Sequence, residues 1–323
     1  MLELLKKGNK SSLIASIVNL FIAGIRGGAW FVTGNTAMFA EFMHALADSA
    51  NQGFVYIGTA LSKKPPTPRF PNGFGRVVHL VCLAAVLVVA IMSYETVKEG
   101  VHHLLHPTES GGLFLLLTVF IVGVILEFFV LYKAMNYVLK EAGVEKTGFQ
   151  VIFLSFKHLK KASPATRLVF MEDLVASCGG LLAIIAVLTS HFTPFKQAEG
   201  VASVIIGLSM FYVVSRVFMD NVTGAIGESD PEMEARIGEL VMQDSSVKDV
   251  QKIVVIREGE ELHVELEVEV DPSLSIAQAD DIKDRLETKI LTHESVTDVI
   301  IAFDETDKVN HWAKKKGQLE KKK

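Results

Sequence analysis

Six apolar segments, each about as long as a bilayer is thick, constrain this chain more than any other feature of its sequence. A spanning helix needs roughly 20 apolar residues, and half of the 323 residues are hydrophobic, with a mean hydropathy of +0.35. The segments cover residues 12–33, 36–62, 77–94, 113–137, 165–190 and 200–218. This pattern predicts a membrane all-α six-helix transmembrane bundle over residues 1–225.

Basic residues predict how these helices are oriented. Lys and Arg gather before the first segment, in the loops 63–76 and 138–166, and at the C-terminus, whereas the other connections hold few of them. Because basic loops stay on the cytoplasmic side, we expect a multi-pass membrane protein with both termini in the cytoplasm. A bacterial inner membrane is the expected location.

The second segment carries His44 and Asp48, which lie four residues apart. Residues at this spacing share one face of a helix, and an ionisable pair at membrane depth is expensive unless it faces a cavity, a partner or an ion. A neutral imidazole and a carboxylate are good ligands for a borderline divalent metal such as Zn²⁺. The alternative is a polar pair hydrogen-bonded to a neighbouring helix.

Other charged residues also fall inside apolar segments. Arg26 is expected to pair with a carboxylate or to extend toward the membrane surface. Glu127 is either functional, as intramembrane carboxylates often are, or it neutralises Arg26 or Lys133. The fifth segment holds two adjacent acids, Glu172 and Asp173.

The composition changes after the sixth segment, where residues 226–306 are rich in Asp and Glu. Helices are predicted at 231–243 and 276–290, and strands at 247–257, 262–270 and 296–303. Between Leu262 and Val270 apolar and polar residues alternate, as in a half-buried strand. Two helices on one face of a small sheet indicate a cytoplasmic α+β (ferredoxin-like) domain, and its acidity disfavours nucleic-acid binding. The Lys-rich tail 307–323 is predicted to be disordered.

Three motifs in this order resemble those of the cation diffusion facilitator (zinc transporter) family. They are His44-x-x-x-Asp48-Ser49 in the second helix, Phe70-Pro71-Asn72-Gly73-Phe74-Gly75-Arg76 before the third, and Met219-Asp220-Asn221 at the end of the sixth. The adjacent Glu172-Asp173 resembles the divergent branch that contains the mitochondrial-type zinc transporters. The resemblance covers nearly the whole chain.

The resemblance implies one tetrahedral transport site, made by four side chains from helices two and five. His44 and Asp48 supply the first half of this site. The fifth helix departs from the family pattern, because Val169 stands where a ligand is expected if Asp173 is aligned, and Ala176 does so if Glu172 is aligned. We expect Asp173 to be the ligand, with Glu172 as the second choice, because adjacent helical residues point about 100° apart.

The family's other sites are less well matched. Phe70 and Phe74 replace the ligands of a second site in the loop before helix three, so no metal is expected there. The C-terminal domain offers His263 and His293 with scattered acids, and the resemblance implies that its main role is to form a homodimer. The family also implies a charge pair between Arg76 and Asp220.

The implied function is proton-coupled export of a divalent cation by alternating access, without covalent chemistry, so no enzyme activity is expected. Zn²⁺ is the first choice and is a transported substrate rather than a cofactor. Protons compete for a neutral His44 and ionised acids. The alternatives are a transporter that prefers Mn²⁺, Fe²⁺ or Co²⁺, and a membrane scaffold or metal sensor that does not transport. The expected partners are divalent metal ions, protons, membrane lipid and a second copy of the chain.

Overall fold

The computed structural model forms two compact units. A helical unit comprises Met1–Ala60 and Val81–Asn221, and a sheet unit comprises Leu61–Leu80 and Val222–Lys323. The structure describes residues 2–144, 148–159, 162, 164–258, 261–293, 296–306 and 309–321.

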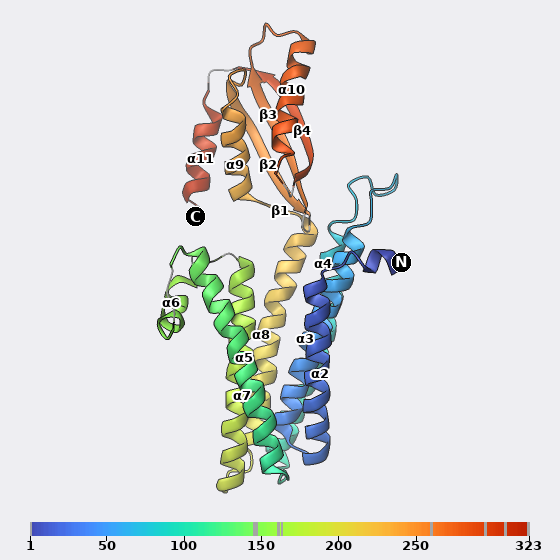
Figure 1. Cartoon of the computed structure of the whole chain (residues 1–323), viewed down its shortest axis with the longest axis vertical. Coiled ribbons are helices and arrows are strands. Elements are labelled where there is room, and N and C mark those ends of the chain that lie inside the picture. Colours follow the sequence, from blue (N-terminus) through green and yellow to red (C-terminus); the bar gives the residue numbers. More distant parts are fainter. Residues whose placement is uncertain are drawn as a thin grey trace. The chain divides into compact units, whose positions relative to one another are not determined.

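Helices, most of them long, make up the helical unit (Figure 1). They are α1 (Leu2–Leu5), α2 (Lys10–Thr33), α3 (Thr36–Ser62), α4 (Val77–Leu105), α5 (Leu113–Glu141), α6 (Gln150–His158), α7 (Pro164–Phe192) and α8 (Ala198–Ile226). Five of them, α2, α4, α5, α7 and α8, are long and apolar enough to cross a membrane. Helix α3 is 27 residues long but more polar. The predicted helical membrane architecture is therefore confirmed, and α6 adds a short helix within the predicted basic loop.

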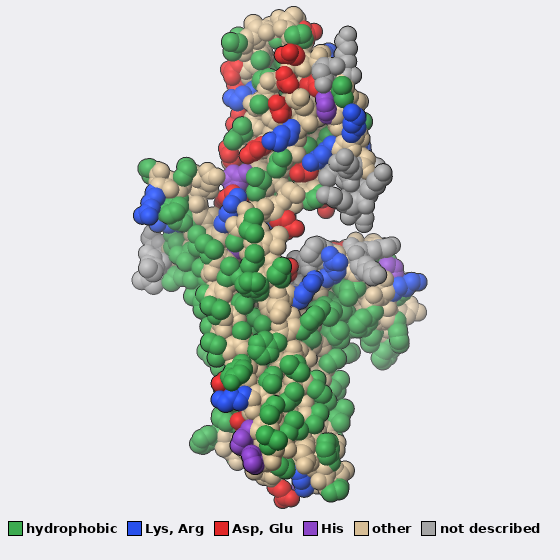
Figure 2. Space-filling view, turned by 180° about the vertical axis from the view of Figure 1, so that it is seen from behind, with side chains coloured by type: hydrophobic (Ala, Val, Ile, Leu, Met, Phe, Trp, Pro, Cys, Tyr) green, Lys and Arg blue, Asp and Glu red, His purple; other side chains and the backbone are tan. Residues whose placement is uncertain are grey.

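The outer surface of these helices is apolar. Phe31, Phe114 and Ile125 are among many large hydrophobic side chains that stay exposed, the first two by more than four-fifths. Figure 2 shows such side chains across the visible face of the helical unit, whereas charged side chains gather over the sheet unit. An apolar surface of this extent is unfavourable in water, so it fits contact with lipid. The chain is a multi-pass membrane protein.

Glycines bring α4 and α8 into direct backbone contact. A Cβ atom at Gly207 would lie 2.7 Å from Val97 Cγ2 and 3.1 Å from the carbonyl oxygen of Ser93. A Cβ at Gly200 would lie 2.8 Å from the carbonyl oxygen of Gly100. Small residues allow this approach, which lets two membrane helices gain packing contacts without a hydrophobic driving force between them.

The sheet unit contains a four-stranded mixed sheet. Its elements are β1 (Glu228–Ser229), α9 (Pro231–Met242), β2 (Asp249–Glu258), β3 (Glu261–Val270), α10 (Ile276–Ile290), β4 (Val296–Glu305) and α11 (His311–Lys321). The strand order is β1-β2-β3-β4, with antiparallel pairing up to β3 and parallel pairing of β3 with β4 across α10. The predicted helix–strand–strand–helix–strand order, and with it the α+β class, is confirmed.

The alternating residues of β3 account for the core of the sheet unit. Val264, Leu266 and Val268 are buried there with Ile237 of α9 and Leu286 of α10. The polar residues between them lie on the opposite face of the strand. The helices begin at side-chain caps, since the carboxylate of Asp230 accepts from the third residue of α9 and Ser275 forms a capping box on α10.

Helix α11 differs from the prediction of a disordered tail. Trp312 is buried against α9, where a Cβ at Gly238 would collide with its ring. Lys315 Nζ lies 3.0 Å from Glu234 Oε2. The contact between Trp312 and Gly238 stabilises the helix, and neither residue stands out in the sequence. Residues 307, 308, 322 and 323 of the tail lie outside the described residues.

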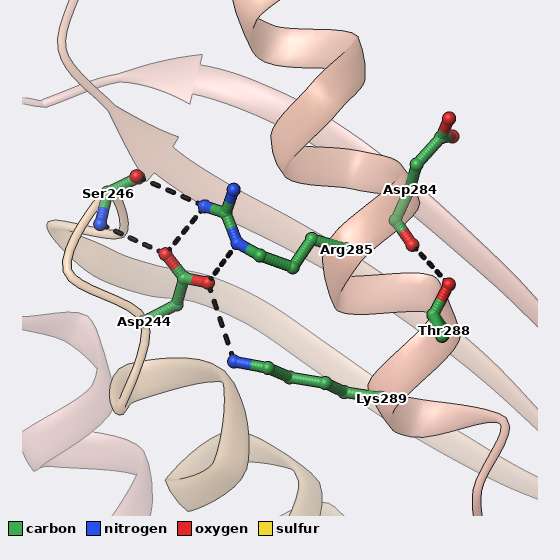
Figure 3. Close-up of polar contacts among 6 residues, drawn as sticks. All are labelled: Asp244, Ser246, Asp284, Arg285, Thr288 and Lys289. Atoms are coloured by element: carbon green, nitrogen blue, oxygen red, sulfur yellow. Dashed lines mark hydrogen bonds and ion pairs between the residues drawn. The ribbon is translucent and has the colours of Figure 1, made fainter.

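An ion-pair cluster connects the end of α9 to α10 (Figure 3). The Arg285 guanidinium donates to both carboxylate oxygens of Asp244, at 2.7 and 2.9 Å, and Lys289 Nζ lies 3.7 Å from the same group. The backbone N–H of Ser246 also donates to Asp244. The Arg285 hydrogen bonds are the main reason why the pKa of the buried Asp244 carboxyl lies well below its usual range.

We predict that Asp244→Asn lowers the free energy of unfolding of the sheet unit by about 1 kcal/mol at pH 7, because the bidentate pair is partly open to solvent. The pKa of Asp244 is lower in the folded than in the unfolded state, so this contribution is present above about pH 4, the unfolded value, and decreases as the pH falls below it. Urea unfolding followed by Trp312 fluorescence, in a Trp30→Phe chain, measures it. The exposed Asp284 supplies the control, since Asp284→Asn is expected to change little.

Candidate intramembrane metal site

Helix α3 positions the first pair of candidate ligands. Its start is fixed by Gly34, in the left-handed conformation at the end of α2, and by Asn35, whose side-chain oxygen accepts from the N–H of Met38 at 2.8 Å. Two to three turns further along, His44 Nε2 lies 3.6 Å from Asp48 Oδ2. The side chain of His44 is largely buried, and that of Asp48 is about half exposed.

Helix α7 supplies the second pair, Glu172 and Asp173, and both side chains are partly buried. Each of them interacts electrostatically with Asp48, and Glu172 also interacts with Asp220 of α8. Asp48 thus pairs with His44 on its own helix and interacts electrostatically with two acids on α7. Among the described residues, however, no three ligand atoms of these four side chains lie within 4.8 Å of one another, so the structure brings together the α3 pair and not the complete predicted site.

One imidazole and three carboxylates make a nitrogen and oxygen donor set. Such a set suits Zn²⁺, which accepts His and carboxylate ligands in a tetrahedral arrangement, and it also suits Mn²⁺, Fe²⁺ and Co²⁺. Among the described residues, the ion pairs of Asp48 include only His44. Acids at membrane depth without a basic partner of their own gain most from a bound cation.

A buried charge cluster lies one turn away on α3. Arg26 of α2 places its guanidinium 3.2 Å from Glu41 Oε2 and 2.5 Å from Glu127 Oε1 of α5. It also donates to the backbone carbonyl of Glu41 at 3.3 Å. Arg26 and Glu41 are almost completely buried. Of the alternatives for Glu127, the structure thus has it neutralise Arg26, and Arg26 pairs with carboxylates.

Two glycines of α7 make room for these carboxylates. A Cβ at Gly179 would lie 3.1 Å from Glu41 Oε1, and one at Gly180 would lie 3.1 Å from Glu127 Oε2. The cluster therefore joins α2, α3 and α5 and packs against α7. Electrostatic interactions also connect it to His44.

Glu41 is the residue that the sequence did not single out. It lies inside the same apolar stretch as His44, three residues before it, and the i, i+3 spacing to that histidine was the available signal. Its partner Arg26 lies on the preceding helix, so the pair becomes visible only when the two helices are placed together.

The loop before α4 makes contacts within the sheet unit. The sequence predicts Asp220 as the partner of Arg76, but the structure places the Arg76 guanidinium 2.5 Å from Glu258 Oε1 and has it donate to the carbonyl of Ile226 at 3.2 Å. Arg76 thus has a partner within its own unit, because β2 brings a buried carboxylate to the loop. Its pairing with Asp220, which belongs to the helical unit, stays a prediction. Phe70 and Phe74 lie against each other with ring centroids 5.1 Å apart.

His263 and His293, the two histidines considered in the C-terminal domain, do not share a set of ligands among the described residues. His263 contacts two acids, Glu258 at 3.5 Å and Asp298 at 3.7 Å. His293 lies in the turn after α10 and donates its backbone N–H to the carbonyl of Ile290.

These features define a multi-pass membrane protein with an imidazole–carboxylate pair on α3 and a C-terminal α+β domain. Residues 12–224 match the model of the cation efflux transmembrane domain, and residues 229–305 match that of the cation efflux protein cytoplasmic domain. The chain therefore belongs to the cation efflux family, which confirms the resemblance.

Curated relatives are similar over most of the chain. The mitochondrial proton-coupled zinc antiporter SLC30A9 of Mus musculus is 25% identical over 252 residues, which are 77% of this chain and 43% of the relative, so the chain spans less than half of that protein. The zinc transporter ZitB of Yersinia pestis is 26% identical over 92% of this chain and 88% of its own length. The cation-efflux pump FieF of Pectobacterium atrosepticum is 22% identical over 91% of both chains.

We predict that Arg26→Ala destabilises the helical unit by about 3–5 kcal/mol, since it leaves the buried carboxylates of Glu41 and Glu127 without their counter-charge. Replacing the whole cluster, as Arg26→Met with Glu41→Leu and Glu127→Leu, is expected to restore most of the loss. Thermal denaturation in detergent, read by size-exclusion chromatography, measures both.

The surface pair between Glu95 and Lys98, 2.9 Å apart, provides the control. Glu95→Gln is expected to cost well under 1 kcal/mol because exposed pairs contribute little. Equal losses for Arg26→Ala and Glu95→Gln would contradict a structural role for the buried cluster.

Proposed function

We propose that this chain exports a divalent metal ion, with Zn²⁺ as the first choice, in exchange for protons. The observation that carries the proposal is the pair of His44 and Asp48, 3.6 Å apart on α3, inside the helical unit. In this proposal the pair forms the transport site together with Asp173 or Glu172 of α7, each of which interacts electrostatically with Asp48. Membership of the cation efflux family and similarity to relatives named as zinc transporters support it.

Proton coupling follows from the ligands. Metal binding requires His44 in its neutral form and the acids in their ionised forms, so each bound metal displaces protons. If the site opens alternately to the two sides of the membrane, metal moves one way and protons move the other. His44 is the group whose ordinary titration range lies closest to physiological pH.

The nitrogen and oxygen donors of the proposed site are compatible with several divalent metals. Three carboxylates and one imidazole leave Mn²⁺, Fe²⁺ and Co²⁺ as competing substrates, and two relatives are named for zinc while one is named as a cation-efflux pump. We therefore give Zn²⁺ first place and treat the selectivity as a result to be measured.

The proposal includes a topology. Basic residues before α2, between α3 and α4 and between α5 and α7 place both termini in the cytoplasm. A bacterial inner membrane fits the relatives from Yersinia and Pectobacterium, and the mitochondrial relative makes an organelle membrane the alternative.

The proposal also includes a homodimer held by the C-terminal domain, which rests on the match of residues 229–305 to a cation efflux cytoplasmic domain. We expect native mass spectrometry of the detergent-solubilised chain to give twice the mass of 35.4 kDa. A purely monomeric spectrum over micromolar concentrations would contradict this part.

We predict that proteoliposomes with an acidic lumen accumulate Zn²⁺, and that His44→Ala and Asp48→Ala each reduce uptake by more than about tenfold, because even residues that only orient a ligand change metal affinity by 10–100-fold. Asp173→Asn and Glu172→Gln, tested separately, identify the ligand on α7. Zinc-sensitive dye inside the vesicles reports uptake.

Glu109→Gln is the matched control, because Glu109 is an exposed acid of the loop between α4 and α5, paired with Lys196 at 3.3 Å. It is expected to keep normal uptake. If the unmodified chain takes up neither Zn²⁺ nor Mn²⁺, Fe²⁺ or Co²⁺, the transport proposal fails and the scaffold or sensor alternative takes its place.

A further inference from the structure

A second group of potential ligands lies in the sheet unit, at the start of α11. Asp249 is the first residue of β2, and its pairing partner across the antiparallel ladder is Glu269, near the end of β3. His311 begins α11. Each of these three residues offers one ligand atom, and the three atoms lie within 4.8 Å of one another.

Glu269 is buried in an unusual way. Glu269 lies on the polar face of β3, where Glu265 is exposed and Glu267 is half-buried. Its own exposed fraction is nevertheless only 1%. Neither of its carboxylate oxygens has a hydrogen-bond partner among the described residues. Burying a carboxylate in this state is costly unless a cation compensates its charge.

The carboxylate of Glu269 is directed at His311. His311 Nδ1 lies 3.3 Å from Glu269 Oε1 and 3.4 Å from Asp249 Oδ2. Bonds of about 2.0 Å from a tetrahedral Zn²⁺ to nitrogen and oxygen place any two ligand atoms about 3.3 Å apart. The two distances from His311 therefore match edges of such a site, and the third pair of ligand atoms lies within 4.8 Å.

We propose that Asp249, Glu269 and His311 bind a divalent cation of the Zn²⁺ class, with the fourth position open to water. This site is separate from the transport site on α3 and α7, and it does not depend on the transport proposal. The bound cation ties the start of α11 to β2 and β3, so metal in the compartment that surrounds this domain stabilises the docked helix.

The rest of the local structure is compatible with a bound cation. The two oxygens of Asp249 accept from the backbone N–H groups of His311, at 2.5 Å, and Trp312, at 3.2 Å. Each carboxylate oxygen has a second lone pair, so Asp249 is able to cap α11 and bind a cation together. The cap and the buried Trp312 hold His311 in position before metal arrives.

A protonated His311 between two acids is the competing explanation, and zinc content distinguishes the two. The experiment uses the full chain with Asp48→Asn, which weakens the transport site, and measures bound Zn²⁺ by equilibrium dialysis. We expect Glu269→Gln and His311→Phe each to remove one Zn²⁺ per chain from this background. Glu267→Gln, on the same strand and in the same register, is expected to remove none.

A local measurement tests the same site without counting ions. Trypsin cuts after Lys314, Lys315 and Lys316 of α11 only when the helix opens. At free Zn²⁺ ten times the dissociation constant, cleavage is expected to be about tenfold slower, because bound ligand reduces the open population by that factor. Glu269→Gln is expected to abolish this protection.

The proposal is overturned if Zn²⁺ leaves the cleavage rate of the Asp48→Asn chain unchanged, or if Glu269→Gln leaves its zinc content unchanged. His311→Lys separates the explanations further, because it keeps a positive charge beside Glu269 and removes the imidazole. If zinc no longer slows trypsin cleavage of α11 in His311→Lys, the result supports the metal site. If α11 is cleaved equally slowly without zinc in the His311→Lys chain and in the chain with His311, an ion pair holds the helix.

Discussion

The helical unit depends on one buried guanidinium. Arg26 is almost completely enclosed, and its cost in an apolar environment is offset only because Glu41 and Glu127 approach it from two other helices. This requirement fixes how α3 is rotated relative to α2 and α5. Since His44 and Asp48 lie on the next two turns of α3, the same contacts determine which way the candidate ligands point. Gly179 and Gly180 of α7 complete the arrangement by leaving room for the two carboxylates.

Local sequence signals were sufficient for most of the fold. The apolar run of the second segment ends where charged and proline-rich sequence begins, and the predicted bounds 36–62 are those of α3. The strict alternation between Leu262 and Val270 determined β3, because each of its side chains experiences either core or solvent. The i, i+4 relation of His44 and Asp48 was likewise local, and the structure keeps them 3.6 Å apart. That they bind metal stays a prediction.

Local sequence signals did not predict contacts between elements that are distant in the chain. The partner of Arg76 is Glu258, more than 180 positions further along the chain, and a one-dimensional pattern gives no reason to prefer it over Asp220. Helix α11 depends on Trp312 packing on a glycine of α9, so its own Lys-rich composition was misleading. Glu172 and Asp173 illustrate another limit, because both interact with Asp48 although they are adjacent on one helix.

Acids of this chain differ in the basic residue that lies beside them, and the distinction carries the functional argument. Glu41 and Glu127 share Arg26, which compensates one of their two charges, and Asp244 has Arg285 and Lys289. The close ion pairs of Asp48 and Glu269 among the described residues are each with a histidine. Histidine is a weak and titratable counter-charge but a good metal ligand. An acid beside a histidine is able to hold either a proton or a metal ion, and for this reason we propose metal binding at both positions.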